Sequence, residues 1–516
     1  MRRAATLTAL LLGMLALPGG QSGLLPARVA AVPVATLELG GLLFSDGRRQ
    51  RMLAVGTRLQ VVDAAGREIY SQDLRPDAPS PALPGTECPG LLMASLVLDE
   101  PLPDGQFDPD QGERALLAVS ARWRDASGAA RSLVALLAWQ DAAAPQLLWR
   151  HDDLRLPALA DPLAPPTLAR LALDATQRDP RHWVVWLGAG LARPASTTDP
   201  SSGRDGAALL ALDAADGRLL WRAGAGIDAA RWPAMTQPMT GGLRALDLDA
   251  DGLLDRLYAG DGVARLWRFD VLPGNTAAER LAGRVMADLA DPTAPRARLI
   301  LAAPDAARLQ PAGQPARLAV TVGTATAATA SPGTGTMPPV GNLLAVVHDP
   351  DPFTTLDAAA HARRPALTLA DLPPVDPTGD ASTSAPAGSA GYHLLLGPDQ
   401  VLVRSLTWGG LLLFSRVEGL PPADADSCRG LGPTVIVKVG AIDALTGRIA
   451  QDLDGNGRRD AGDLAVPLPT GTTLAASELP RRDPVSGQCL WASIPLADCP
   501  ALPRVRSLYW RRQDAD

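Results

Sequence analysis

Short runs of alternating apolar and polar residues, separated by turn residues, recur along most of the chain and predict an all-β protein. Alternation with a period of two places every second side chain on the same face of a strand. One phrase, a strand followed by a tight turn and a second strand, recurs at 51–70, 206–224, 255–271 and 435–451. The same apolar alternation continues at 132–152 and 182–194, and residues 394–417 add another strand pair.

Repeated β-units of this kind cannot bury their faces alone, so we expect them to stack radially as a β-propeller of about seven blades over residues 36–513. Their irregular spacing excludes repeats of equal length and predicts inserted loops near 320–341 and 372–391, which are rich in Pro, Gly and small residues. A pair of β-sandwiches is the structural alternative. The chain length and the recurring phrase favour the propeller.

Composition supports this fold class and excludes one class of partner. The 516 residues include 49 Gly and 48 Pro but only 4% aromatic residues, which favours many turns and short strands over long helices. The formal net charge of −7 offers no basic surface, so a nucleic-acid partner is not expected.

The N-terminus has the pattern of a secretory signal peptide over residues 1–31. Arg2 and Arg3 precede the apolar run AATLTALLLGMLALP, and small residues follow it, so that cleavage is expected between 19 and 31. A membrane anchor is the alternative, but the run is shorter than the roughly 20 residues needed to span a bilayer. We therefore expect an exported protein.

Four cysteines, Cys88, Cys428, Cys489 and Cys499, agree with an oxidising compartment, and none has metal-ligand spacing. Cys489 and Cys499 could close a local loop while Cys88 pairs with Cys428. Three connectivities are possible, and buried free thiols are a further alternative.

The segment 246–261, LDLDADGLLDRLYAGD, has the spacing of a calcium-binding loop. Its aspartates at loop positions 1, 3, 5 and 9 are Asp247, Asp249, Asp251 and Asp255. Gly252 stands at position 6, where the chain turns sharply, and Leu253 offers its backbone carbonyl at position 7. Position 12 is Tyr258 instead of Glu, so we expect a shorter loop that closes at Asp255. The alternative is a solvated acidic turn, with Asp261 in the turn between the two strands that follow.

A second loop of this type is expected at 452–463, DLDGNGRRDAGD. The residues at positions 1, 3, 5, 7 (backbone), 9 and 12 are Asp452, Asp454, Asn456, Arg458, Asp460 and Asp463, with Gly457 at position 6. Both loops follow a strand, so we expect calcium to act as a structural clip at blade edges and not as a sensor between paired helices.

Nothing in the sequence predicts an enzyme. The five histidines are scattered without zinc-ligand spacing, and neither a GxSxG motif nor a P-loop is present. The nearest enzymatic alternative is a quinoprotein-type dehydrogenase, because LLALDAADGRLLWRAG at 209–224 resembles its blade repeats. The adjacent cysteine pair seen in many members of that class is missing. No catalytic residues, organic cofactor or small-molecule substrate are expected.

Several phrases together resemble the C-terminal propeller of the PilY family of type IV pilus assembly and tip proteins. DLDADGLLDRLYAGDGVARLWRFDV at 247–271 resembles the family's calcium loop and the strand pair after it. AVGTRLQVVDAAGREI, WVVWLGAG and GAALLALDAADGRLLW resemble its first and middle blades, and the segments around Cys428 and at 504–513 resemble its closing blade.

The resemblance implies that the loop aspartates and the Leu253 carbonyl bind Ca²⁺, and that the protein acts with minor pilins or pilus tip components. It implies roles in pilus assembly, control of extension and retraction, or surface adhesion, at the periplasm, the outer-membrane surface or the pilus tip. Family members normally carry a long N-terminal half, whereas here the predicted signal is followed almost directly by the propeller. A generic periplasmic scaffold is a further alternative.

Overall fold

The computed structural model describes residues 36–496 with several gaps. The gaps are 77–90, 100–105, 126–128, 142, 173–181, 193–205, 225–229, 274–279, 296, 327–339, 380–383, 387, 398–399, 419–435, 469–480, 483–488 and 492–493. Every described residue belongs to one compact unit within residues 34–516. The predicted signal peptide therefore lies outside the described residues.

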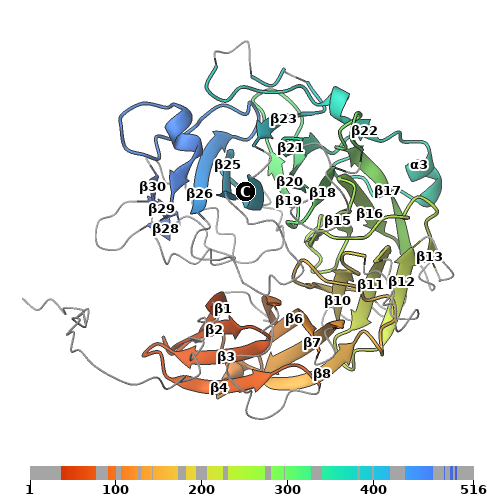
Figure 1. The fold of residues 1–516 in the computed structure, drawn as a ribbon, viewed down its shortest axis with the longest axis vertical. Coiled ribbons are helices and arrows are strands. Elements are labelled where there is room, and N and C mark those ends of the chain that lie inside the picture. Colours follow the sequence, from red (N-terminus) through yellow and green to blue (C-terminus); the bar gives the residue numbers. More distant parts are fainter. Residues whose placement is uncertain are drawn as a thin grey trace, which may run out of the picture. The chain divides into compact units, whose positions relative to one another are not determined.

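The described residues form seven β-sheets, which we number blades 1 to 7 in chain order (Figure 1). Blade 1 contains β1 (Thr36–Leu43), β2 (Arg49–Val55), β3 (Arg58–Asp63) and β4 (Glu68–Asp73). Blade 2 contains β5 (Leu91–Asp99), β6 (Arg114–Arg124), β7 (Ala130–Trp139) and β8 (Gln146–Asp152). Blade 3 contains β9 (Thr167–Arg170), β10 (Trp183–Gly188), β11 (Ala208–Asp213), β12 (Leu219–Gly224) and β13 (Ala230–Arg231).

The remaining blades follow the same order. Blade 4 contains β14 (Leu243–Leu246), β15 (Arg256–Gly260), β16 (Arg265–Val271), β17 (Leu281–Asp288) and the distant β22 (Leu367–Thr368). Blade 5 contains β18 (Arg298–Ile300), β19 (Asp305–Leu309), β20 (Arg317–Thr326), β21 (Asn342–His348) and β23 (Gly391–Leu396). Blade 6 contains β24 (Val401–Trp408), β25 (Leu411–Glu418), β26 (Ile436–Asp443) and β27 (Val466–Pro467). Blade 7 contains β28 (Arg481–Arg482), β29 (Cys489–Trp491) and β30 (Ile494–Leu496).

Neighbouring strands pair antiparallel, except that β13 and β22 add to blades 3 and 4 in parallel. Helical structure in the described residues is short: α3 (Ala358–Ala362) and the 3₁₀ turns η1 (Pro109–Gln111), η3 (Leu369–Asp371) and η5 (Ala461–Leu464). No helix in this part of the chain has the length and apolar content to cross a bilayer.

Burial on both faces explains why the central strands are almost continuously apolar. In β7, Leu133 and Leu137 pack into the cluster shared with blade 1, whereas Val134 and Leu136 pack into the cluster shared with blade 3. Further clusters join blades 3 and 4, 4 and 5, 5 and 6, and 6 and 7. Sheets that pack face to face on successive neighbours are the propeller arrangement, and the all-β propeller prediction of about seven blades is confirmed.

The structure describes parts of the two segments expected as inserted loops. Residues 320–326 continue β20, while 327–339 lie outside the described residues. At the start of the second segment, Leu372 and Val375 are buried, and the Val375 N–H donates to the His393 carbonyl at 2.9 Å. This stretch packs because its few apolar side chains reach the blade 4–5 and 5–6 interfaces.

Cys489 on β29 is disulfide-bonded. Its partner is one of Cys88, Cys428 and Cys499, all of which lie outside the described residues. The bond excludes a free thiol at Cys489, and the choice among the three connectivities stays a prediction.

Candidate metal centre

The first acidic loop lies between β14 and β15 of blade 4. β14 ends at Leu246 and β15 begins at Arg256, so the loop occupies residues 247–255, the short length expected from the sequence. Asp247 is buried, and its two carboxylate oxygens accept the backbone N–H groups of Ala250 at 2.7 Å and Gly252 at 2.8 Å. These bonds curl the loop around the first aspartate.

Two residues of the loop have left-handed backbone conformations. Gly252 has φ of 87°, which meets the sharp turn predicted at position 6, and Ala250 has φ of 64°. An alanine with positive φ is strained, because its Cβ approaches the following carbonyl oxygen. The loop therefore stores strain at Ala250 to keep its carboxylates together.

The loop brings three carboxylates to one point. Ligand oxygens of Asp247, Asp249 and Asp255 all lie within 4.8 Å of one another. Because Ca²⁺ binds oxygen at about 2.4 Å, one ion can contact oxygens that lie up to about 4.8 Å apart. Asp251 lies outside this group of three, and its Oδ1 accepts the Leu253 N–H at 2.8 Å.

The electrostatics of the loop fit a hard cation. Burial raises the pKa of Asp247 to about 6, and the charges of Asp255 and Asp251 add to the rise against the N–H groups of Gly252 and Ala250. Burial also raises the pKa of Asp255, and the neighbouring Asp249 and Asp251 add to that rise. Carboxylates held close enough to disfavour their own charge gain stability when a divalent ion lies between them.

The loop is also bound to blade 3. The Leu254 N–H donates to the Arg170 carbonyl on β9 at 2.8 Å. The Arg170 guanidinium lies 4.7 Å from the centre of the Trp183 ring and pairs with Asp99 of blade 2 at 2.9 Å. A change in the loop can therefore reach the junction of blades 2, 3 and 4.

The second acidic loop follows β26 in blade 6 and leads into η5. Oxygens of Asp452, Asp454 and Asp463 lie within 4.8 Å of one another. Asp452 accepts the N–H groups of Gly455 and Gly457, each at 2.8 Å.

The two loops share one hydrogen-bonding pattern despite their different lengths. The first aspartate accepts the N–H groups three and five residues later in both loops. The closing carboxylate accepts the second and third N–H groups, from Leu248 and Asp249 to Asp255 and from Leu453 and Asp454 to Asp463. Asp463 is thus the counterpart of Asp255.

The other residues predicted for the second loop have local roles in the structure. Asp460 caps η5, with its Oδ1 accepting the Gly462 N–H at 2.9 Å. Asn456 accepts the Arg458 N–H at 2.7 Å, the same bond that Asp251 makes with Leu253. Asp251, Leu253, Asn456, Arg458 and Asp460 lie outside the two groups of three carboxylates, and metal binding by all residues of both loops stays a prediction.

Asp261 lies outside the metal loop, in the predicted turn. It is buried between β15 and β16, where its carboxylate accepts the N–H groups of Val263 and Arg265, at 3.0 and 2.9 Å. It also accepts the Arg265 Nε–H and the Trp267 indole N–H, at 2.7 and 2.9 Å. The fifth aspartate of the motif is therefore structural.

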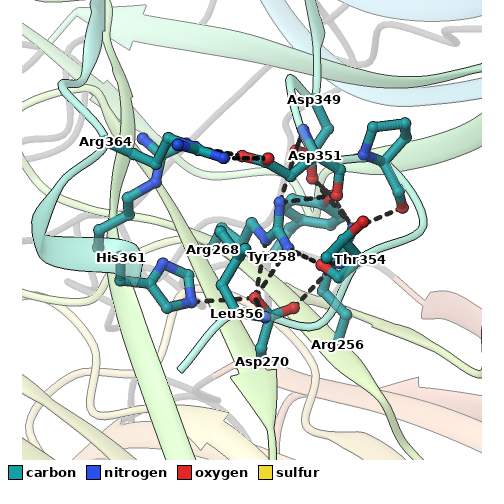
Figure 2. A network of polar contacts seen from close by, with 12 residues as sticks. Arg256, Tyr258, Arg268, Asp270, Asp349, Asp351, Thr354, Leu356, His361 and Arg364 are labelled. Carbon is teal, nitrogen blue, oxygen red and sulfur yellow. Dashed lines mark hydrogen bonds and ion pairs between the residues drawn. The ribbon is translucent and has the colours of Figure 1, made fainter. Parts of the chain in front are cut away.

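Sequence reasoning missed a buried ionic network directly after the first loop (Figure 2). Arg256 and Arg268, on β15 and β16, have fully buried side chains, and so do Asp270 and Asp349. Asp270 accepts Arg256 Nε at 2.7 Å and Arg268 Nη2 at 2.8 Å, while Asp349 accepts Arg268 Nη1 at 2.6 Å and Arg256 Nη1 at 3.1 Å. Tyr258 donates its hydroxyl to Asp349. The only signal in the sequence is that Arg256, Arg268 and Asp270 are charged residues within otherwise apolar strands.

Comparison with known proteins supports the fold assignment. The structure is similar to that of the Pseudomonas aeruginosa PilY1 C-terminal domain, with a TM-score of 0.50 and 18% sequence identity, over 81% of this chain and 86% of that chain. The fold is that of the PilY1 C-terminal domain. The resemblance to PilY proteins noted in the sequence is thus confirmed at the level of the fold.

A weaker similarity is to the Penicillium chrysogenum α-L-arabinanase complexed with arabinobiose, with a TM-score of 0.34 and 11% identity, over 79% of this chain and 93% of that chain. This value is too low to bear on function. No protein-family model and no curated protein sequence matches the chain.

Proposed function

We propose that this protein is an exported, calcium-binding β-propeller that acts as a binding module in type IV pilus assembly, through minor pilins or pilus tip components. The carrying observation is the convergence of Asp247, Asp249 and Asp255 within 4.8 Å, on a chain with the PilY1 C-terminal fold. A binding role, without catalysis, agrees with loops whose polar groups are engaged in holding backbone geometry.

Calcium has a defined task in this proposal. It compensates the repulsion among the loop carboxylates and so holds the Leu254 contact to Arg170 of blade 3. The second loop does the same with Asp452, Asp454 and Asp463 beside η5. Control of pilus extension and retraction, and tip adhesion, would follow from an interaction face that is ordered only when calcium is bound.

Titration calorimetry with Ca²⁺ tests the metal site. We expect binding by the wild type, loss of one site in the double variant Asp247→Asn/Asp255→Asn, and unchanged binding in Asp216→Asn, a control in an exposed turn. If Ca²⁺ gives the same heat of binding with the wild type and with the double variant, the predicted calcium site at residues 247–255 is refuted.

Binding to purified soluble domains of candidate minor pilins, in calcium and in chelator, tests the partner. Calcium-dependent binding supports the proposal. If no pilin domain binds the wild type in calcium, the pilus role is wrong even where calcium binding is observed.

A further inference from the structure

The buried ionic network immobilises a short surface segment. We call residues 349–364 the strap; it runs from the end of β21 through α3 to Arg364. Arg256 donates to the Pro352 and Thr354 carbonyls at 2.7 and 2.8 Å, and Arg268 donates to the Asp351 and Thr354 carbonyls at 3.0 and 2.7 Å. Figure 2 shows these guanidinium groups between Asp270 and the strap residues Asp349 and Thr354.

The far end of the strap is held as well. His361 of α3 lies 2.9 Å from Asp270, and the Leu356 N–H donates to Asp270 at 3.2 Å. Arg364 closes the strap on itself with two bonds to Asp351, at 2.9 and 2.7 Å. A buried ion pair is by itself weak evidence for stability relative to apolar packing. In this network the hydrogen bonds from the two arginines also fix the strap backbone.

Phe353 stands at the centre of this fixed backbone. The backbone carbonyls of its neighbours Pro352 and Thr354 accept hydrogen bonds from the buried Arg256. The Phe353 side chain itself is 46% exposed. It is the one aromatic side chain among the large exposed hydrophobic residues of the described part of the chain. Single exposed apolar side chains are common on protein surfaces, but the backbone on both sides of this one is held by hydrogen bonds from buried arginines.

Arg308 of β19 completes the feature. Its guanidinium lies 5.3 Å from the Phe353 ring centre, and within the described residues it has no carboxylate partner. Aromatic residues and arginine are enriched in protein interfaces, and arginine is also enriched among the few residues that carry most of the binding energy. A backbone ordered before binding also lowers the entropy lost on association.

We propose that Phe353 and Arg308 form the docking point for a protein partner that presents an apolar or aromatic side chain flanked by carboxylates. The apolar side chain packs on the Phe353 ring, and a carboxylate pairs with the Arg308 guanidinium. Asp351 and Asp357 on the same strap disfavour a uniformly anionic surface such as a lipid headgroup layer. This inference rests on the proposed function, because we expect the partner to be one of the pilus components.

Two probes test this docking point with the full-length protein. The first is an array of synthetic peptides that each carry one Trp flanked by zero to four Asp residues, and the second is the set of minor-pilin domains used above. The variants are Phe353→Ala and Arg308→Gln, and the control is Leu395→Ala, which removes an aliphatic side chain that is 67% exposed. Thermal melts equal to the wild type establish that each variant is folded.

We expect one or two Asp residues beside the Trp to strengthen peptide binding, and three or four to add nothing further because Asp351 and Asp357 repel the extra charge. Binding should fall about tenfold or more in both variants but not in the control. Pilin binding that is lost in Phe353→Ala supports the docking point in the pilus role. Pilin binding that is equal in the wild type and Phe353→Ala refutes the docking point and leaves the pilus role standing.

Peptide binding through Phe353 without any pilin binding keeps the docking point and refutes the pilus role. Absence of peptide and pilin binding refutes both. Phe353-dependent binding to phosphatidylglycerol vesicles in place of peptides would overturn the protein-partner assignment.

Discussion

Replacement of Asp270 by Asn tests whether the buried network is held together by charge. Burial would raise the pKa of Asp270, but His361, Arg256 and Arg268 outweigh burial and lower the pKa to about 2. Relative to the ordinary value of 3.8, this corresponds to about 2 kcal/mol of stability at neutral pH. The neutral Asn also leaves two buried arginines with one buried carboxylate, and a broken buried pair costs about 3–5 kcal/mol.

For a domain of this size the entropy of unfolding is about 1 kcal/mol/K, so we expect Asp270→Asn to lower Tm by about 3–5 °C. Scanning calorimetry at pH 7 measures this change. The control is Asp351→Asn, which breaks the more exposed pair with Arg364 and should change stability by less than about 1 kcal/mol.

The pH dependence of the same experiment separates charge from shape. Because the folded pKa of Asp270 is below its unfolded value, its stabilisation is present above about pH 4 and is lost as the pH falls toward 2. The Tm difference between wild type and Asp270→Asn should therefore shrink over that window. Equal Tm values for Asp270→Asn and Asp351→Asn at pH 7, or a gap that persists at pH 2, would refute the electrostatic explanation.

Further predictions concern the metal loop and the blade interfaces. Since burial raises the folded pKa of Asp247 to about 6, well above its unfolded value, the Tm in chelator should rise as the pH falls from 7 to 4. Asp247→Asn should reduce that rise, and Asp255, whose pKa is also raised, accounts for part of the remainder. Ala250→Gly should stabilise the protein by about 0.5–1 kcal/mol, because it relieves a left-handed alanine where the second loop has Gly455 with φ of 75°. An unchanged or lower denaturation midpoint in urea would contradict that account of the strain. Gly323→Ala should destabilise by about 1–3 kcal/mol, because an added Cβ would meet the Leu402 side chain at the blade 5–6 interface, and a wild-type urea midpoint would show that the interface can adjust.

Local pattern was sufficient to predict where the two acidic loops form and which carboxylates begin and close them. The spacing of aspartate and glycine in 247–255 predicted a closed short loop, and backbone N–H groups at those spacings do bond to Asp247 and Asp255. In the longer loop, spacing placed Asp460 in the predicted ligand set; in the structure it also caps η5 and lies outside the group formed by Asp452, Asp454 and Asp463, and its role as a ligand stays a prediction. The loop positions in the sequence do not show the capping role of Asp460, because the additional residues of the second loop fold into the helical turn η5 only in the structure.

The sequence by itself determined the strand repeats, the turns and the two acidic loops, because these depend on residues close together in the chain. The period-two alternation specifies a strand and its two faces before any partner is known. Only the tertiary structure decided which blade each face meets, the link from Leu254 to Arg170, and the strap bound by Arg256 and Arg268. Those contacts join residues from about 80 to 100 positions apart, and their geometry depends on the packing of whole sheets, which no local pattern encodes.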